Sequence, residues 1–200
     1  MSAVAAPRLV KDEPKYNPTP LPSLEMLALE KMSMRELDRI FMRGAMPDVD
    51  SLIGWEFRGM NGLIYMLPIG RALGIKKFVK GFVRDEDGRV MGYNCAVRNN
   101  ALDGRWNVRS KRFGFYEVHP VDPTARDNKY LHALMLDYSK GDNPITDPSA
   151  ILRDYLVQVD PANPDLFLGK AYMAIGPLRL RSNFFFLERF RRGLTDYVKR

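Results

Sequence analysis

Cysteine is nearly absent from this 200-residue chain, since Cys95 is its single occurrence. An intramolecular disulfide is therefore excluded, which fits a reducing compartment. No stretch reaches the roughly eighteen apolar residues that a membrane-spanning helix needs, and the N-terminus lacks the pattern of a secretory signal. These absences predict a soluble, cytoplasmic protein. The length suits one domain with terminal extensions, whose core needs neither a disulfide nor a metal.

Motifs for nucleotide, metal and nucleophilic chemistry are also missing. The glycines never form a phosphate-loop or dinucleotide spacing between a strand and a helix. The two histidines, His119 and His132, form no Ser-His-Asp or Cys-His arrangement, and Cys95 has the pattern of a small buried residue. A haem or metal role for His132 would need further ligands at workable geometry. We therefore predict no metal, no cofactor and no catalytic residue.

Positive charge is in excess, with 31 Lys and Arg against 24 Asp and Glu and a net charge of +7. The basic residues cluster weakly, at Lys76-Lys77, Arg109 to Arg112 and Arg189 to Arg192, and no nucleic-acid-binding motif accompanies them. A solvated basic surface is the simplest interpretation, and we predict no nucleic-acid partner. An anionic membrane face or an acidic protein partner is the alternative.

The N-terminal part divides into an arm and a helical segment. Residues 1–22 hold five prolines among polar residues, which predicts an extended arm. Within residues 23–44, Ser23 opens a first apolar run, and Ser33 with Glu36 forms a capping-box pattern ahead of a second. We expect two short helices there, or one bent helix.

The rest of the chain shows apolar and polar alternation typical of strands. Eight strands are expected, from a first run beginning at Ser51 and continuing at Lys76 to Arg84, Arg89 to Arg98, Arg105 to Val118, Tyr130 to Tyr138, Ile151 to Val159, Asp165 to Ile175 and Leu180 to Phe190. Short loops such as Asp87-Gly88 make neighbours antiparallel. The pattern predicts a mainly β barrel or sandwich, with room for one small ligand in an eight-stranded barrel.

Two segments interrupt or follow these strands. Residues 63–75 (LIYMLPIGRALGI) are apolar but broken by Pro68 and two glycines, which predicts a short irregular helix lying as a lid over the barrel mouth. Residues 191–200 are expected to form a basic tail or a short amphipathic helix. The barrel domain is therefore placed at residues 23–190.

The order of several landmarks resembles a known family. They are Leu52, Gly54, Trp55 and Gly59 after a helix, then Lys80-Gly81-Phe82, Leu136-Asp137-Tyr138 with Asn143-Pro144, Arg153-Asp154, Leu168-Gly169-Lys170 and Phe185 to Arg189. Over residues 33–190 the chain resembles the GXWXG and DUF4334 domain proteins, uncharacterised bacterial proteins that look like lipocalin or calycin barrels. The resemblance implies a lipocalin/calycin-like antiparallel barrel in which Arg189 packs over Trp55 to close it through a cation–π contact.

Aromatic and charged residues on the strands are the candidates for ligand contact: Trp55, Tyr93, His132, Tyr138, Arg153, Lys170 and Tyr172. His132 would share a strand face with Tyr138. A buried pair of Arg153 with Asp137, or of Asp154 with Lys170, could orient a ligand's carboxylate or carbonyl, while structural pairing or solvent exposure is the alternative for both.

Two functions from different classes fit these patterns. We expect a non-catalytic barrel that binds a small hydrophobic or lipid-like ligand under the 63–75 lid. The alternative is a structural or interaction subunit that docks on a protein assembly or membrane surface through its arm, its apolar insertion and its basic tail. An isomerase or cyclase would need an internal acid or base such as Asp137 or Tyr138 with a shifted pKa.

Overall fold

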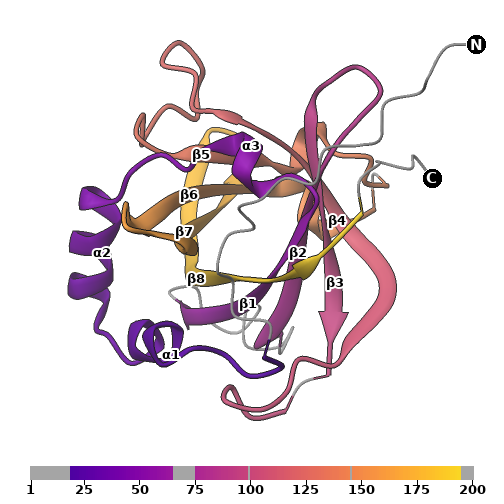
Figure 1. The fold of residues 1–200 in the computed structure, drawn as a ribbon. Helices are drawn as coiled ribbons and strands as arrows, with labels where there is room; N and C mark the ends of the chain where they lie inside the picture. Colours follow the sequence, from indigo (N-terminus) through magenta and orange to yellow (C-terminus); the bar gives the residue numbers. More distant parts are fainter. Residues whose placement is uncertain (1–18, 65–74, 99, 145, 195–200) are drawn as a thin grey trace, which may run out of the picture.

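Eight antiparallel strands close into a barrel in the computed structural model, which describes residues 19–64, 75–98, 100–144 and 146–194 (Figure 1). The strands are β1 (Trp55–Ile64), β2 (Lys77–Arg84), β3 (Val90–Val97), β4 (Val108–Pro120), β5 (Leu134–Asp137), β6 (Leu152–Asp160), β7 (Asn163–Ile175) and β8 (Leu178–Arg192). Each strand pairs with the next in the chain, and β1 pairs with β8. The predicted mainly β, eight-stranded antiparallel barrel is confirmed.

Two separate apolar clusters show which side of the strands faces inward. One cluster takes residues from all eight strands, among them Phe57, Tyr116 and Leu187, and it is the barrel interior. The other joins the opposite strand faces to Leu37 and Phe41 of a helix, so it lies outside the barrel. Both faces are therefore buried over much of the sheet.

Aromatic side chains fill the interior by folding over glycines of the neighbouring strand. Gly169 on β7 is the cross-strand partner of Phe185 on β8, and Gly59 and Gly92 stand in the same relation to Phe78 and Tyr116. A Cβ added at Gly169 would lie 2.0 Å from the Phe185 ring. The interior is consequently packed with rings at these levels.

We expect Gly169→Ala to lower the free energy of unfolding by about 1–3 kcal/mol, because the added methyl group overlaps the Phe185 ring. Urea unfolding measures the change. In a Phe185→Leu background the same substitution should be better tolerated, since the smaller side chain leaves the space open. Equal effects of Gly169→Ala in both backgrounds would show that the ring contact is not the cause.

Between residue 19 and β1 the chain forms three short helices. They are α1 (Leu24–Glu30), α2 (Met34–Arg43) and α3 (Val49–Leu52). Ser33 and Glu36 form the predicted capping box at the start of α2. The expected strand start at Ser51 is wrong, because Asp48 caps the single turn of α3 and the first strand begins at Trp55. In Figure 1, α1 and α2 lie beside the barrel on its outer surface.

The fifth strand is shorter than the sequence suggested. It covers only Leu134–Asp137 rather than residues 130–138, because Tyr130 to Ala133 form a turn and the Asp137 side chain accepts a hydrogen bond from Ser139 N at 2.9 Å. That bond starts the short 3-10 helix η1 (Tyr138–Lys140), which is followed by η2 (Pro148–Ile151).

A side chain closes the barrel wall where β5 ends early. The first half of β4 has no ladder partner in β5, whose pairing begins at Glu117. Asn143 takes that place, since its Oδ1 accepts from Phe115 N at 2.7 Å and its Nδ2 donates to Phe115 O at 2.7 Å. The wall between β4 and β6 is thus held at this level by a loop rather than by a strand.

The described part of the arm packs on the chain's own barrel. Arg58 of β1 donates to Thr19 O at 2.8 Å and to Leu21 O, and its Nε lies 3.1 Å from Glu188. Ser23 N donates to the same carboxylate at 3.2 Å. Residues 1–18 of the predicted arm lie outside the described residues.

Two further predicted segments are only partly described. Residues 65–74 of the expected lid lie outside the described residues, while Leu63 and Ile64 belong to β1 rather than to an insertion. Arg191 and Arg192 of the expected tail belong to β8, and residues 195–200 lie outside. No helix in the described ranges is long and apolar enough to cross a membrane.

Candidate functional site

A buried polar group lies among apolar side chains inside the barrel. It consists of Lys80 (β2), Asn94 (β3), Tyr138 (η1) and Asp154 (β6), and we call it the Lys80 cluster. The Lys80 ammonium donates to Asn94 Oδ1 at 3.0 Å and to the Tyr138 hydroxyl, and lies 3.5 Å from Asp154 Oδ2. Tyr138 in turn donates to Asp154 Oδ2 at 3.2 Å. A cation, an anion and a hydroxyl therefore meet away from water.

Strand register explains why these four residues meet. Lys80 and Asn94 are direct cross-strand partners, so their side chains share the inner face. Asp154 is the partner of Leu136, which lies two residues before Tyr138 on the chain. The cluster is assembled from four separate elements, and none of its pairs is local in the sequence.

Aromatic rings surround the Lys80 amine. Its Nζ lies 4.6 Å from the ring centroid of Tyr116, 5.0 Å from that of Tyr138, 5.4 Å from that of Phe185 and 5.5 Å from that of Phe78. Such faces attract a cation, and they also present an apolar surface to any molecule that approaches the amine.

Burial shifts both ionisable partners towards their neutral forms. Loss of hydration lowers the pKa of Lys80 to about 8, although the charge of Asp154 opposes the shift. Loss of hydration raises the pKa of Asp154, although the Lys80 ammonium opposes it. Burial also raises the pKa of Tyr138, with the Asp154 charge as the second cause, so its hydroxyl stays protonated and available as a donor.

Two buried polar atoms in this region have no hydrogen-bond partner among the described residues. They are Asp154 Oδ1 and Ser149 Oγ. A buried acceptor without a donor costs about 1–3 kcal/mol, so Asp154 Oδ1 is a place where a donor on another molecule would be stabilised.

Gly114 allows Asn94, Tyr138 and Ser149 to lie close to the backbone of β4. Its φ of 54° is in the left-handed region, and a Cβ there would lie 2.9 Å from Asn94 Nδ2 and 3.4 Å from both Ser149 Oγ and the Tyr138 ring. Only glycine combines this backbone with such close neighbours. Ser149, in η2, therefore lies close to Gly114, as do Asn94 and Tyr138 of the Lys80 cluster.

Of the seven ligand-contact candidates from the sequence, only Tyr138 belongs to this cluster, together with Asp154, which was considered as a partner of Lys170. Trp55 also faces inward, but at one end of the barrel, where Arg189 lies over its ring at 4.8 Å and Arg192 at 3.9 Å from the centroid. Tyr93 lies on the outer face and donates to Glu56 Oε1 at 2.9 Å.

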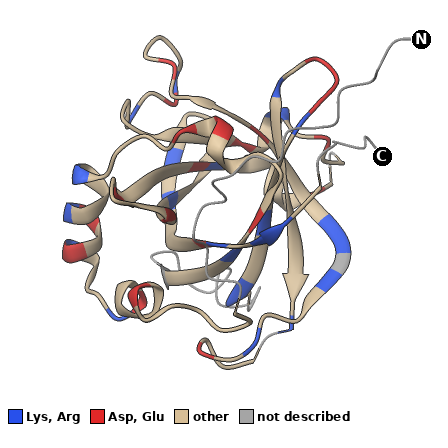
Figure 2. Ribbon diagram, viewed as in Figure 1, with Lys and Arg blue, Asp and Glu red and all other residues tan. Residues whose placement is uncertain are grey.

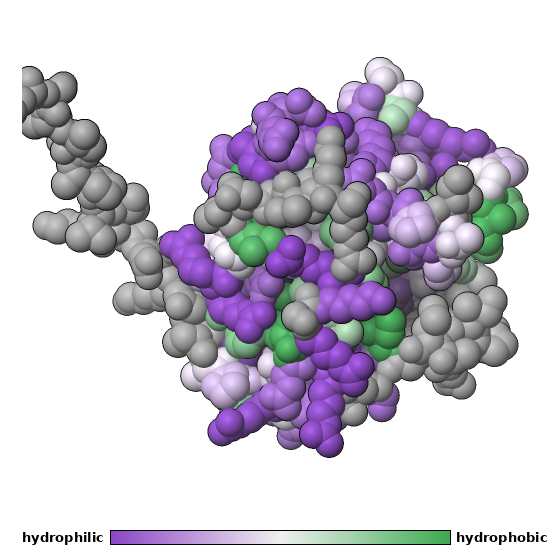
Figure 3. Space-filling view, turned by 90° about the vertical axis from the view of Figure 1, so that its right-hand side faces the viewer, coloured by the Kyte–Doolittle hydropathy of each residue, from purple (hydrophilic) through white to green (hydrophobic). Residues whose placement is uncertain are grey.

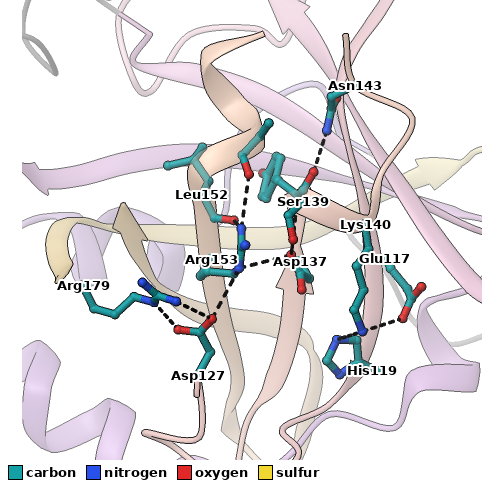
Figure 4. A network of polar contacts seen from close by, with 12 residues as sticks. Glu117, His119, Asp127, Asp137, Ser139, Lys140, Asn143, Leu152, Arg153 and Arg179 are labelled. Atoms are coloured by element: carbon teal, nitrogen blue, oxygen red, sulfur yellow. Dashed lines mark hydrogen bonds and ion pairs between the residues drawn. The ribbon is translucent and has the colours of Figure 1, made fainter. Parts of the chain in front are cut away.

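Arg153 lies in a polar network on the outside of the barrel (Figure 4). Its Nε is 3.2 Å from Asp137 Oδ1 and 3.5 Å from Asp127 Oδ2, and Arg179 also pairs with Asp127. Its Nη1 donates to Leu152 O at 2.6 Å. Of the two pairs considered from the sequence, the Arg153–Asp137 pair is present, but it ties loops to strand ends and does not face the interior.

The second pair, Asp154 with Lys170, is wrong. Asp154 stands opposite Ala171 and Lys170 opposite Tyr155, so the two charged side chains point to opposite faces. Lys170 instead reaches outward to Asp38 of α2 at 2.7 Å. The true partner of Asp154 is Lys80.

Tyr172 and His132 also lie between the barrel and α2. The hydroxyls of Tyr172 and Tyr130 are 2.8 Å apart, and His132 Nε2 is 3.0 Å from Phe41 O. The expected strand position of His132 is wrong, since it lies in the turn before β5. The contacts of His132 and Tyr130 with Phe41 attach the helix to the barrel. Within the described ranges, no group of three or more His, Cys, Asp or Glu side chains could hold a metal ion.

The sequence reasoning did not single out Lys80, Asn94 or Ser149 as site residues. A signal for Lys80 was present, because Phe78 and Phe82 flank it at the two-residue spacing of one strand face. A charged residue between two aromatic residues on one face indicates burial with a partner.

Comparisons with known proteins add little to this geometry. No family model matches the chain, and no curated protein matches it. A crystal structure of a protein from Thermomonospora curvata is similar over 84% of this chain and 95% of the other, at 18% sequence identity and a TM-score of 0.39. A likeness at that level says nothing about function.

Proposed function

We propose that the barrel binds a small apolar molecule carrying one polar group, and that the polar group is held by the Lys80 cluster. One observation carries the proposal: a fully buried amine, carboxyl and hydroxyl stand inside an aromatic interior, and Asp154 Oδ1 has no donor there. Burying charged groups costs free energy, and apolar residues in their place often leave a fold equally stable or more stable. The presence of these groups in the interior therefore favours a role in binding a ligand.

The cluster suits a ligand with a hydroxyl or carbonyl oxygen. Lys80 and Tyr138 are donors for that oxygen, and Asp154 Oδ1 accepts from a ligand hydroxyl. The rings of Phe78, Tyr116 and Phe185 would contact the apolar body. Because these rings fill the interior, a ligand displaces at least one of them from its glycine. Because Asn143 and not a strand pairs with Phe115 there, entry through that part of the wall would break no β4–β5 ladder bond.

The test is displacement of a dansyl-labelled fatty acid, together with native mass spectrometry of gently purified protein. Tyr138→Phe should weaken binding about five- to tenfold, the effect of one lost hydrogen bond. Tyr172→Phe is the matched control, because it removes the same hydroxyl from the outer face and should leave binding unchanged. A folded barrel with no bound species and no displacement, or equal losses in both variants, would contradict the proposal.

A second candidate is an interaction module, favoured by the filled interior and by the surface of α2. A hollow of about 490 Å³ beside that helix is lined by the exposed Met34 and Met42, by four arginines and by one acidic residue, Asp38. The arginines are Arg35, Arg39, Arg43 and Arg181. Such a surface suits an acidic partner. Figure 2 shows further basic residues on the outer bend of β4, and in Figure 3 hydrophilic side chains cover most of the described part of that face.

The arm distinguishes the two candidates. Residues 19–22 contribute to the packing of the barrel itself, so the test removes only residues 1–18 and leaves those contacts in place. Loss of an oligomer or of a bound acidic protein on truncation, measured by light scattering, would support the interaction module. Unchanged mass with retained fatty-acid binding would favour the ligand-binding barrel.

A further inference from the structure

We propose that Lys80 captures an apolar aldehyde as an imine inside the barrel. This inference rests on the proposed binding function and names the ligand's reactive group. Its basis is the contact set around one nitrogen: a carboxyl at 3.5 Å, a phenol hydroxyl in hydrogen-bond contact and four aromatic rings within 5.5 Å.

Imine formation needs an uncharged amine, an acid close to the nitrogen and little water. Burial lowers the pKa of Lys80 to about 8, so near neutral pH its uncharged fraction exceeds that of an ordinary lysine on the order of a hundredfold. Burial raises the pKa of Asp154, which favours its acid form. The aromatic surroundings exclude water that would otherwise hydrolyse the product.

The step is balanced by the residues present. The uncharged Lys80 Nζ attacks the aldehyde carbon, an N–C bond forms, and the carbonyl oxygen gains a proton while the nitrogen loses one. The C–O bond of this carbinolamine then breaks, and the oxygen leaves as water with a second proton, which Asp154 gives and regains from the nitrogen. Amine and aldehyde become imine and water, with no oxidant or reductant.

The cluster also suits the product. If the imine takes the proton of Asp154, an iminium–carboxylate pair replaces the ammonium–carboxylate pair, and the charge inside the barrel does not change. During attack the Tyr138 hydroxyl hydrogen can turn from Asp154 Oδ2 to the carbonyl oxygen, because the hydroxyl lies beside both Lys80 and Asp154.

Lys77 is an internal reference within the same strand. Burial lowers its pKa to about 8 as well. However, its ammonium donates to Asn100 Oδ1 at 2.8 Å and to Gly104 O at 2.7 Å, and two more carbonyl oxygens lie within 3.2 Å. All four of these acceptors are carbonyl oxygens and none can give a proton to a carbinolamine, whereas Lys80 has the Asp154 carboxyl and the Tyr138 hydroxyl beside it. Lys80 should therefore react and Lys77 should not.

The experiment treats the whole chain with benzaldehyde and cyanoborohydride near neutral pH, then maps benzylated lysines by peptide mass spectrometry. Lys80 should be labelled at least ten times faster than Lys77 and than the exposed Lys129. Asp154→Asn should slow labelling of Lys80 tenfold or more without changing that of Lys129. Because the mapping is done on the unaltered chain, the result does not depend on whether any Lys80 variant folds.

Labelling of Lys129 without faster labelling of Lys80 would overturn the imine. Benzyl alcohol, which cannot form an imine, separates this failure from that of the proposed function. If the alcohol displaces the dansyl fatty acid but Lys80 is not labelled, reversible binding stands and the imine falls. If Lys80 is not labelled and the alcohol does not displace the probe, both the imine and the reversible binding are contradicted. If Lys80 is labelled without any competition by the alcohol, covalent capture stands and reversible binding falls.

Discussion

Lys80→Met is expected to lower the free energy of unfolding by about 3–5 kcal/mol, because it leaves the Asp154 carboxyl buried without its cation. Asp154→Leu should have a similar effect by leaving the ammonium unpaired. The double variant should return to within about 1 kcal/mol of the original chain or exceed it, since a well-packed apolar pair often replaces a buried ion pair without loss. Urea unfolding of the four proteins measures the cycle.

Three outcomes of this cycle are informative. A stable double variant that no longer binds the dansyl fatty acid would show that the Lys80 cluster serves binding rather than folding. A double variant that still binds would remove the cluster from the proposed site. A double variant as unstable as the single ones would show that the pair stabilises the fold on balance.

The same pair should make stability depend on pH. The pKa of Lys80 is lowered on folding from 10.5 to about 8, so its stabilising contribution is fully present above pH 10.5 and is lost as the pH falls through about 8. The pKa of Asp154 is raised above 3.8, so its contribution is present below pH 3.8 and is lost as the pH rises through the folded value. Relative to the double variant, the original chain should gain on the order of 3 kcal/mol between pH 8 and 10.5. Equal slopes for the two proteins would contradict the assignment.

Arg58→Met should have a second large effect, about 3–5 kcal/mol of unfolding free energy, because Glu188 loses its buried counter-ion. The same change removes the donors to Thr19 O and Leu21 O, so residues 19–22 should become open to limited proteolysis. Arg58→Met with Glu188→Leu should recover part of the stability but should not protect the arm.

Arg84 provides the matched control for this prediction. It pairs with Asp50, and both side chains are exposed, at 45% and 71%. Exposed ion pairs contribute about 0–1 kcal/mol, so Arg84→Met should change stability little and should leave the arm protected. A comparable loss in both variants would mean that the buried position of Arg58 is not what matters.

The strand pattern was predictable because it is local. Alternation over five to ten residues, with turns such as Asp87-Gly88 between runs, needs no knowledge of distant residues, and all eight predicted strands exist. Strand ends were harder to predict where a side chain forms hydrogen bonds that replace those of the β-ladder. Asp137 ends β5 by capping η1, and Asp48 adds the turn of α3 ahead of Trp55.

The candidate site was less predictable because both strand faces are buried. In the run Phe184-Phe185-Phe186 all three residues are buried, so polarity does not tell the inner from the outer side. Helices α1 and α2 cover the outer face of β6 to β8 and make it look like core. As a result, no sequence pattern distinguished Tyr138, which faces the interior, from Lys170 and Tyr172, which face α2.

The sequence by itself determined eight antiparallel strands with capped helices ahead of them, because period-two alternation, turn residues and capping residues act over a few positions. Closure into a barrel depends on the pairing of β1 with β8, which lie far apart in the chain. Only the tertiary structure decided which charges meet. Lys80 and Asp154 are on β2 and β6, and the choice of Lys80 over Lys170 as partner depends on a register in which one residue reverses the face. Such a register is set by closure of the whole barrel, and no local pattern records it.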